Sequence, residues 1–369
     1  MRAHDRVFMT TVTVLMSVYN GRSYLAETVE SVLSQDYCDF EFLIIDDAST
    51  DDTVRLIESY RDSRIRLLQN DRNIGQAESL NRGLWEAKGK YIARLDHDDI
   101  CLPSRLSRQV AYLEARPEVA AVSTWAYRID SKGRQIGYHR SRLDNFGVFV
   151  GQLLVVQSTL IHPGVMYRKE VVAQLSGYDP SYAPAEDFEL WTRMATCGHR
   201  AHIIPEELLL YRVHERQLSI VQKALQRKNA SRAHQKLVEA FCESPRARKL
   251  GAMLRLDPEF FREHRSKEDF CATAGALDNM IERVHSKAGM TSAEECAFRR
   301  TIDRWVGSIL VRKGAALPSP LSRALFLVLS PLMILNLRSW SARLSAYFPR
   351  YRFSFLTGGR HLIHLFGKK

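Results

Sequence analysis

The stretch Phe40-Glu41-Phe42-Leu43-Ile44-Ile45-Asp46-Asp47 decides the fold of this chain. Its first six residues are mostly β-branched, aromatic or aliphatic, which is typical of a buried strand. The strand ends at two carboxylates. Residues 48–53 then supply turn formers and an N-cap for a helix through residues 54–60. The order of strand, acidic turn and helix predicts an α/β unit.

The same order recurs at a second acidic cluster. Residues 91–95 resemble a strand, Asp96-His97-Asp98-Asp99 follow at its end, and Pro103 opens the next helix. Further strands are expected at residues 12–16 and 65–68, with helices between the strands. The alternation through about residue 124 predicts a mostly parallel sheet with helices on both faces.

A third acidic pair, Glu186-Asp187, also lies where an apolar run gives way to a polar turn. Open α/β sheets bind their ligands at strand ends, so carboxylates far apart in sequence can converge on one crevice. There they can hold a divalent cation and a nucleotide and accept a proton. The pattern predicts chemistry on a phosphorylated substrate.

Other short motifs accompany these clusters in a fixed order. The first half contains Ser17-Val18-Tyr19-Asn20-Gly21, Asp46-Asp47-Ala48-Ser49-Thr50-Asp51-Asp52-Thr53, Asn73-Ile74-Gly75 and Asn81-Arg82-Gly83. The second half contains His162-Pro163-Gly164-Val165-Met166-Tyr167-Arg168-Lys169, Gly177-Tyr178-Asp179, Ala185-Glu186-Asp187-Phe188-Glu189-Leu190-Trp191 and Tyr211-Arg212-Val213-His214. The series resembles family 2 inverting glycosyltransferases of the GT-A fold over residues 11 to about 215. Asp96-His97-Asp98-Asp99 takes the place of that family's DxD motif.

The resemblance implies a binding site for a nucleotide-sugar, with a UDP-sugar favoured. Ser17, Tyr19 and Asp47 would contact the nucleoside, with Asp47 facing the base, and Asp96 would lie near the ribose. Asp98 would be the main protein ligand of a Mg²⁺ or Mn²⁺ ion at the diphosphate, which suits hard carboxylate oxygens.

The resemblance also assigns the catalytic and peripheral residues. Asp187 would be the general base, and Glu186 either orients that base or caps a helix. His214 matches a position where some relatives place a further metal ligand or a phosphate contact. Family members that synthesise polymers carry a Gln-x-x-Arg-Trp motif after the base. The only Arg-Trp here is Arg304-Trp305, so the resemblance favours addition of single sugars.

This chemistry explains the residue types. A departing nucleoside diphosphate gains negative charge, which a cation stabilises. The acceptor hydroxyl must lose a proton as it attacks, and a nearby carboxylate that takes it contributes typically about 10²–10⁴-fold in rate. A single displacement inverts the anomeric carbon.

Simpler structural roles compete for several of these polar and aromatic residues. Capping alone explains Asp51, Asp52 and Asp99. Tyr178 and Trp191 are expected in the core. We expect the side chains of four other residues to serve solvated or turn positions rather than the reaction: His97, His162, Arg94 and Arg168.

Composition indicates a cytoplasmic enzyme with an attachment. The six cysteines show no CxxC pair and no metal spacing, which predicts reduced thiols, and residues 1–11 lack the design of a signal peptide. The net charge is +11, and the eleven Lys and Arg residues of 304–369, a segment without Asp or Glu, account for all of it. The same segment holds an apolar run at 324–337, too short to span a bilayer comfortably.

We therefore expect three regions: a catalytic domain at 1–220, a helical extension at 221–303 and a basic, apolar tail at 304–369. The tail is predicted to bind the anionic inner face of the membrane peripherally, and the alternative is a helical subdomain packed on the enzyme. It has no nucleic-acid-binding module. Two other functions remain open: a metal-dependent nucleotidyltransferase or pyrophosphatase, and a non-catalytic scaffold. The lack of a Gly-rich phosphate loop weakens the former.

Overall fold

In the computed structural model, the described residues are 10–155, 160–255, 276, 279–286, 289–313, 351–354 and 364–367. Four parallel strands form the first half of the sheet: β1 (Thr10–Val18), β2 (Phe40–Asp46), β3 (Ile65–Gln69) and β4 (Gly89–Arg94). Their spatial order is β3-β2-β1-β4. The connecting helices are α1 (Leu25–Leu33), α2 (Thr53–Ser59) and α3 (Gln76–Glu86), and α4 (Arg105–Glu114) begins two residues after Pro103.

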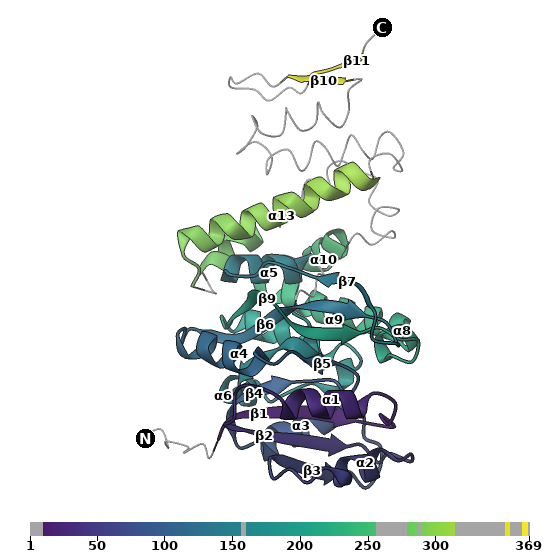
Figure 1. Cartoon of the computed structure of the whole chain (residues 1–369). Helices are drawn as coiled ribbons and strands as arrows, with labels where there is room; N and C mark the ends of the chain where they lie inside the picture. Colours follow the sequence, from purple (N-terminus) through teal and green to yellow (C-terminus); the bar gives the residue numbers. More distant parts are fainter. Residues whose placement is uncertain are drawn as a thin grey trace.

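The second half adds further strands to this sheet, in the order β4-β8-β6-β9-β5. Figure 1 shows β3, β2, β1 and β4 at the lower end of the sheet, with β6 and β9 above them. Strand β8 pairs antiparallel with both β4 and β6, whereas the long strands β6 and β9 run parallel to each other. The bounds are β5 (Ile100–Cys101), β6 (Val119–Ile129), β7 (Gln135–His139), β8 (Met166–Arg168) and β9 (Arg200–Arg212). The predicted α/β class, with a mostly parallel sheet between helices, is confirmed, and the antiparallel pairings are those of β5, β7 and β8.

Alternation along β1 builds a core on each side of the sheet. Val14 and Met16 belong to one cluster of buried side chains, and Leu15 between them belongs to the other. Successive strand residues point to opposite faces, so both faces of a central strand are apolar when both are covered. Helices α1 and α4 contribute to the first cluster and α3 contributes to the second.

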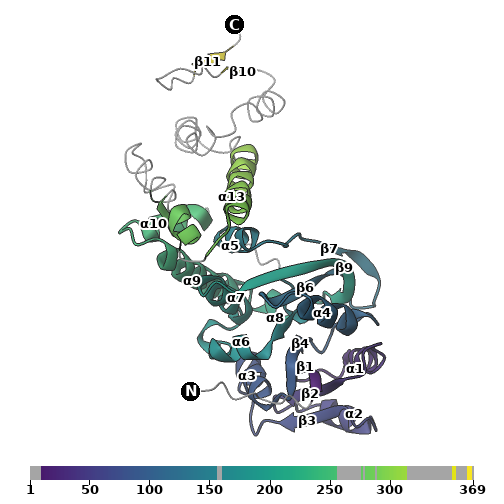
Figure 2. The same ribbon diagram turned by 90° about the vertical axis from the view of Figure 1, so that its left-hand side faces the viewer.

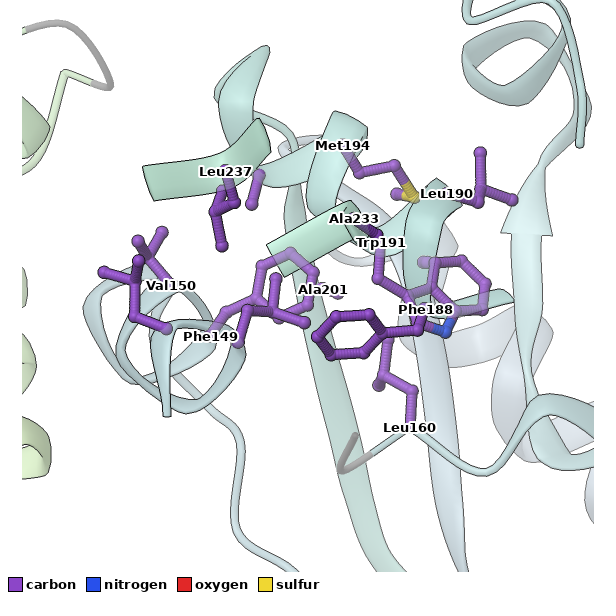
Figure 3. Packing of buried hydrophobic residues seen from close by; sticks show 14 of the residues in the cluster. Phe149, Val150, Leu160, Phe188, Leu190, Trp191, Met194, Ala201, Ala233 and Leu237 are labelled. Carbon is purple, nitrogen blue, oxygen red and sulfur yellow. The ribbon is translucent and has the colours of Figure 1, made fainter. Parts of the chain in front are cut away.

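The helices that follow the sheet continue the second core. This core runs from Leu15 through Phe149 and Trp191 to Leu237 and Phe298. Figure 3 shows Phe149, Trp191 and Leu237 packed in this cluster. The remaining elements are α5 (Phe146–Leu154), η1 (His162–Gly164), α6 (Lys169–Gln174), η2 (Pro180–Tyr182), α7 (Glu186–Thr196), α8 (Leu218–Val221), α9 (Lys223–Phe241), α10 (Ala247–Arg255) and α13 (Ser292–Lys313).

Close helix contact joins the extension to the sheet domain. A Cβ added to Gly147 of α5 would lie 1.9 Å from the carbonyl oxygen of Glu294 in α13. Arg200 of β9 forms an ion pair with Glu294 at 3.3 Å. Figures 1 and 2 both place α13 at the opposite end of the described helices and sheet from β3. The three regions drawn from the sequence stay predictions, but the described residues between 221 and 302 share a core with the sheet domain.

Most of the predicted tail lies outside the described residues, and so does its apolar run at 324–337. The described parts of 304–369 are the end of α13 and two short strands, β10 (Tyr351–Ser354) and β11 (His364–Gly367), which pair antiparallel. Within the part of the chain that the structure describes, no helix combines the length and apolar character that crossing a membrane requires.

Candidate active site

The carboxyl ends of β2, β1 and β4 lie side by side and bring the predicted nucleotide residues together. Strand register pairs Val18 with Asp46, and the Asp47 amide donates to the Val18 carbonyl at 2.8 Å. On the other side of β1, Leu15 pairs with Arg94, two residues before Asp96. Ser17 is buried in this row, whereas Tyr19 just beyond the strand is 45% exposed.

Asp47 is buried and shapes the loop that follows β3. Its carboxylate accepts hydrogen bonds from Asn70 Nδ2 at 2.7 Å and from the amides of Ile74 and Gly75 at 2.9 and 2.8 Å. Gly75 has φ +89°, a conformation that favours glycine. Asp47 thus fixes the wall of the crevice, and a base contact would use the remaining lone pairs of its oxygens. The sequence did not single out Asn70.

The second acidic cluster is compact. Carboxylate oxygens of Asp96, Asp98 and Asp99 lie within 4.8 Å of one another. His214, two residues after β9, places Nε2 2.8 Å from Oδ2 of Asp98. The long strand β9 therefore brings a histidine 116 residues away in sequence onto this aspartate. A carboxylate and an imidazole at this spacing fit a divalent cation of the Mn²⁺ or Mg²⁺ type, with Asp96 beside them.

The surroundings of Asp98 favour the charged form of its carboxyl. Burial raises the pKa of its carboxyl, but the hydrogen bond with His214 and the nearby charges of His97 and His214 outweigh burial and lower that pKa. His97 is half-buried, with its ring beside Gly21, where a Cβ would meet the ring at 2.7 Å. His97 was expected to be a solvated loop residue; it does lie in a loop, but the loop folds back on the end of β1 and covers part of the ring.

Asp99 has a structural role, as predicted, although it binds the backbone of β9 and does not cap a helix. It is fully buried, and its Oδ1 accepts from the Arg212 amide at 2.8 Å. Burial, followed by the charges of Asp98 and Asp96, raises the pKa of its carboxyl. The Arg212 guanidinium donates to the Asp98 carbonyl at 2.8 Å and pairs with Glu27 at 2.7 Å. Arg212 thus ties β9 to the acidic loop, a role that the sequence did not reveal.

The pair Glu186-Asp187 starts α7, next to the same edge of the sheet. Burial raises the pKa of Asp187 to about 6, opposed by the hydrogen bond from the Phe188 amide, with Asp96 raising it further and Arg94 lowering it. Burial and the charge of Asp187 raise the pKa of Glu186 to about 7. Among the described residues, the buried Oε2 of Glu186 has no hydrogen-bond partner. Two carboxyls with raised pKa values are typical of a site for proton transfer.

Arg94 corrects the expectation of an exposed arginine. It is fully buried, and Nη2 lies 2.5 Å from Oδ1 of Asp96. Its charge also lowers the pKa of Asp187, so Arg94 interacts electrostatically with both Asp96 and Asp187. The β4 register, with the Arg94 amide donating to the Val165 carbonyl at 2.8 Å, fixes this position. The sequence offered one sign of this burial, because Arg94 stands within an otherwise apolar strand.

The remaining motif residues are structural. Arg168 is half-buried and donates to the carbonyls of Val119 and Leu113 at 2.9 and 2.7 Å, so it anchors β8. His162 lies in the turn η1, as predicted, with Nε2 3.0 Å from the Tyr178 hydroxyl. Tyr178 and Trp191 are in the core, also as predicted.

The fold and the comparisons define the class of protein. Residues 13–176 match the family described as Glycosyl transferase family 2. The chain belongs to this family and is a glycosyltransferase of the GT-A fold. This confirms the fold class and the enzyme class read from the motifs, and favours glycosyl transfer over the nucleotidyltransferase, pyrophosphatase and scaffold alternatives.

Particular relatives are similar over the same region. Putative glycosyltransferase EpsE of Bacillus subtilis is 36% identical over 209 residues, covering 55% of this chain and 73% of EpsE. The Escherichia coli UDP-Glc:alpha-D-GlcNAc-diphosphoundecaprenol beta-1,3-glucosyltransferase WfaP is 32% identical over 207 residues, covering 56% of this chain and 78% of WfaP. The S. aureus TarS 1-349 structure in complex with UDP aligns with a TM-score of 0.53 over 97% of each chain at 16% identity, a likeness of fold.

Proposed function

We propose that this glycosyltransferase moves one sugar from a nucleoside diphosphate donor to a hydroxyl of a glycan or lipid-linked acceptor, with inversion at the anomeric carbon. The observation that supports the proposal is the position of Asp96, which clusters with the His214-bonded Asp98 and whose charge also raises the pKa of Asp187. The Asp98–His214 pair suits a diphosphate with its cation, and the raised pKa of Asp187 suits proton removal.

On the donor side, Ser17, Tyr19 and Asp47 would bind the nucleoside and Asp96 the ribose. Asp98 and His214 would hold a Mn²⁺ or Mg²⁺ ion, which neutralises charge on the departing diphosphate when bound. Arg94 keeps Asp96 in place through its ion pair, and Arg212 fixes the backbone of Asp98.

On the acceptor side, Asp187 would accept the proton of the attacking hydroxyl. Its carboxyl, with a pKa of about 6, is mostly ionised at neutral pH yet more basic than an exposed aspartate. The bond from the acceptor oxygen forms on the face opposite the departing phosphate. Glu186 would orient the base or share its proton, because its carboxyl titrates near the same pH.

The name of WfaP supports a UDP-sugar, a hexosyl group and a lipid diphosphate acceptor. The amylovoran biosynthesis glycosyltransferase AmsE of Erwinia amylovora, 27% identical over 204 residues, supports a role in surface polysaccharide assembly. A lipid-linked acceptor would require action at the cytoplasmic face of the membrane, held there peripherally by the basic tail. The catalytic residues would all belong to the region 1–220.

A panel of nucleotide-sugars tests the donor, with thermal unfolding measured with and without Mn²⁺. A donor at about 100 times its Kd should stabilise the protein by about 2.7 kcal/mol, and the gain should require the metal. Transfer to an acceptor from a polyprenyl diphosphate series would then name the product. A folded protein that no nucleotide-sugar stabilises would contradict the proposal.

A further inference from the structure

Exposed apolar side chains gather on α8 and the start of α9. Nine large apolar side chains are exposed among the described residues, and four of them fall within eight consecutive positions: Leu218, Ile220, Val221 and Leu225, at 44–66% exposure. Helix α8 buries none of its residues. Single exposed apolar residues are ordinary on a protein surface, whereas a contiguous group of them typically marks an interaction site.

Basic side chains surround this apolar cluster. Arg216, Lys223, Arg227 and Lys228 are exposed, and within the described part of the chain none of them forms an ion pair with an acidic residue. Residues 216–238 contain no Asp or Glu. We call residues 216–228 the α8–α9 surface. Its combination of apolar and cationic side chains complements an anionic lipid surface.

The α8–α9 surface is attached to both sides of the active site. On the donor side, Gln217 Nε2 donates to the Arg212 carbonyl at 2.5 Å, and Arg212 holds the Asp98 loop. On the acceptor side, Gln226 and Asn229 donate to the carbonyls of Pro184 and Ala183 at 3.1 and 2.7 Å. These carbonyls lie two and three residues before Glu186. These hydrogen bonds join the surface and the adjacent Asn229 to the segments that precede His214 and Glu186.

We propose that the α8–α9 surface docks on an anionic bilayer and holds the mouth of the active site against the headgroups. The inference rests on the proposed lipid-linked acceptor, and it assigns the contact to a segment distinct from the tail at 304–369. Leu218, Ile220, Val221 and Leu225 enter the headgroup boundary, and the four basic side chains meet lipid phosphates. A reacting hydroxyl close to the headgroups then reaches the site without leaving the membrane.

The test measures where the full-length protein touches vesicles. Val221→Cys carries an environment-sensitive fluorophore in a chain whose cysteines other than the buried Cys101 and Cys242 are replaced by serine. The matched control is the same label at Trp85→Cys. Trp85 is 56% exposed on α3, which ends before β4 begins and so lies at the opposite edge of the sheet. The probe is phosphatidylcholine vesicles with and without phosphatidylglycerol.

We expect a blue shift at position 221 with the anionic vesicles and none at position 85. Lys223→Glu, Arg227→Glu and Lys228→Glu should each weaken vesicle binding by at least about fivefold, because a basic residue near an anionic surface contributes about that factor. Metal-dependent stabilisation by the nucleotide-sugar should stay unchanged in these variants, so loss of docking and failure of the proposed function are separable.

Three outcomes would overturn the proposal. Vesicle binding without a shift at position 221 would assign the membrane contact elsewhere, for example to the tail. An equal shift with purely zwitterionic vesicles would remove the role of the basic side chains. A shift that follows protein concentration without vesicles would show that the surface binds a second copy of the chain.

Discussion

If Asp187 is the base, as we propose, this one residue favours catalysis at the expense of stability. Its carboxyl has a folded-state pKa of about 6 against an ordinary value of 3.8, so ionisation opposes folding. Asp187→Asn should lower kcat by about 10²–10⁴-fold, because the proton acceptor is lost. The same variant should gain up to about 3 kcal/mol of unfolding free energy above pH 6, and this gain should vanish near pH 4.

Turnover and urea unfolding of this variant would be measured together. Asp179→Asn is the matched control, since Asp179 lies eight residues upstream and caps η2 through the Ser181 amide at 2.9 Å. That control should lose stability and keep its chemistry. Full activity in Asp187→Asn would refute the proposed base.

The pH dependence of kcat/KM follows from the same carboxyl. A general base must be ionised, so kcat/KM should fall as the pH drops through about 6. Asp96→Asn removes a negative charge that helps to raise this pKa, so the descending limb should move to lower pH. A profile that is flat between pH 5 and 7 in the wild-type protein would argue against Asp187.

The His214–Asp98 pair makes a separate prediction about the cation. His214→Ala should raise the Mn²⁺ concentration for half-maximal activity by about 10–100-fold, as loss of a metal's coordinating or orienting partner commonly does. His202→Ala is the control, because His202 also lies half-buried on β9 and also makes a 2.8 Å hydrogen bond, to the Tyr112 hydroxyl. An unchanged metal requirement in His214→Ala would remove His214 from the site.

At the scale of elements, the contact of α5 with α13 should be the most sensitive to added volume. Gly147→Ala places a methyl group against the Glu294 carbonyl, so we expect a loss of about 1–3 kcal/mol in unfolding free energy. Gly137→Ala on β7 meets no atom within 4 Å and should be nearly neutral. Equal stabilities in thermal melts would mean that α13 is displaced from α5.

The strand ends of the first half were predictable from the sequence, and those of the second half were not. Around β2 and β4 the apolar run, the carboxylates and the following helix agree, so local pattern and final structure coincide. Strand β8 is only three residues long and enters between β4 and β6 through non-local pairing. Nothing in its local sequence indicates that position or its antiparallel direction.

The same distinction applies to the site residues. Asp47, Asp98 and Asp187 stand out because carboxylates at strand ends need an explanation. The burial of Arg94, the Asn70–Asp47 hydrogen bond and the hold of Arg212 on Asp98 depend on contacts between segments that only the folded sheet brings together. Their roles therefore needed the structure.

At the scale of the whole molecule, one continuous core links the catalytic edge to the helical extension. One buried cluster contains side chains of β1, α7, α9 and α13. The helix that begins with Glu186 therefore packs against helices of the extension. The described helices of the extension thus share the core that packs against α7.

The buried guanidinium of Arg94 has one further consequence. It is paired with Asp96 on the donor side and also stabilises the negative charge of Asp187 on the acceptor side. Asp96 raises the pKa of Asp187, so a cation that arrives with the donor and offsets the charge of Asp96 would leave the base more readily ionised. In the proposed mechanism, binding of the donor with its cation would thus make the base easier to ionise before the acceptor reacts.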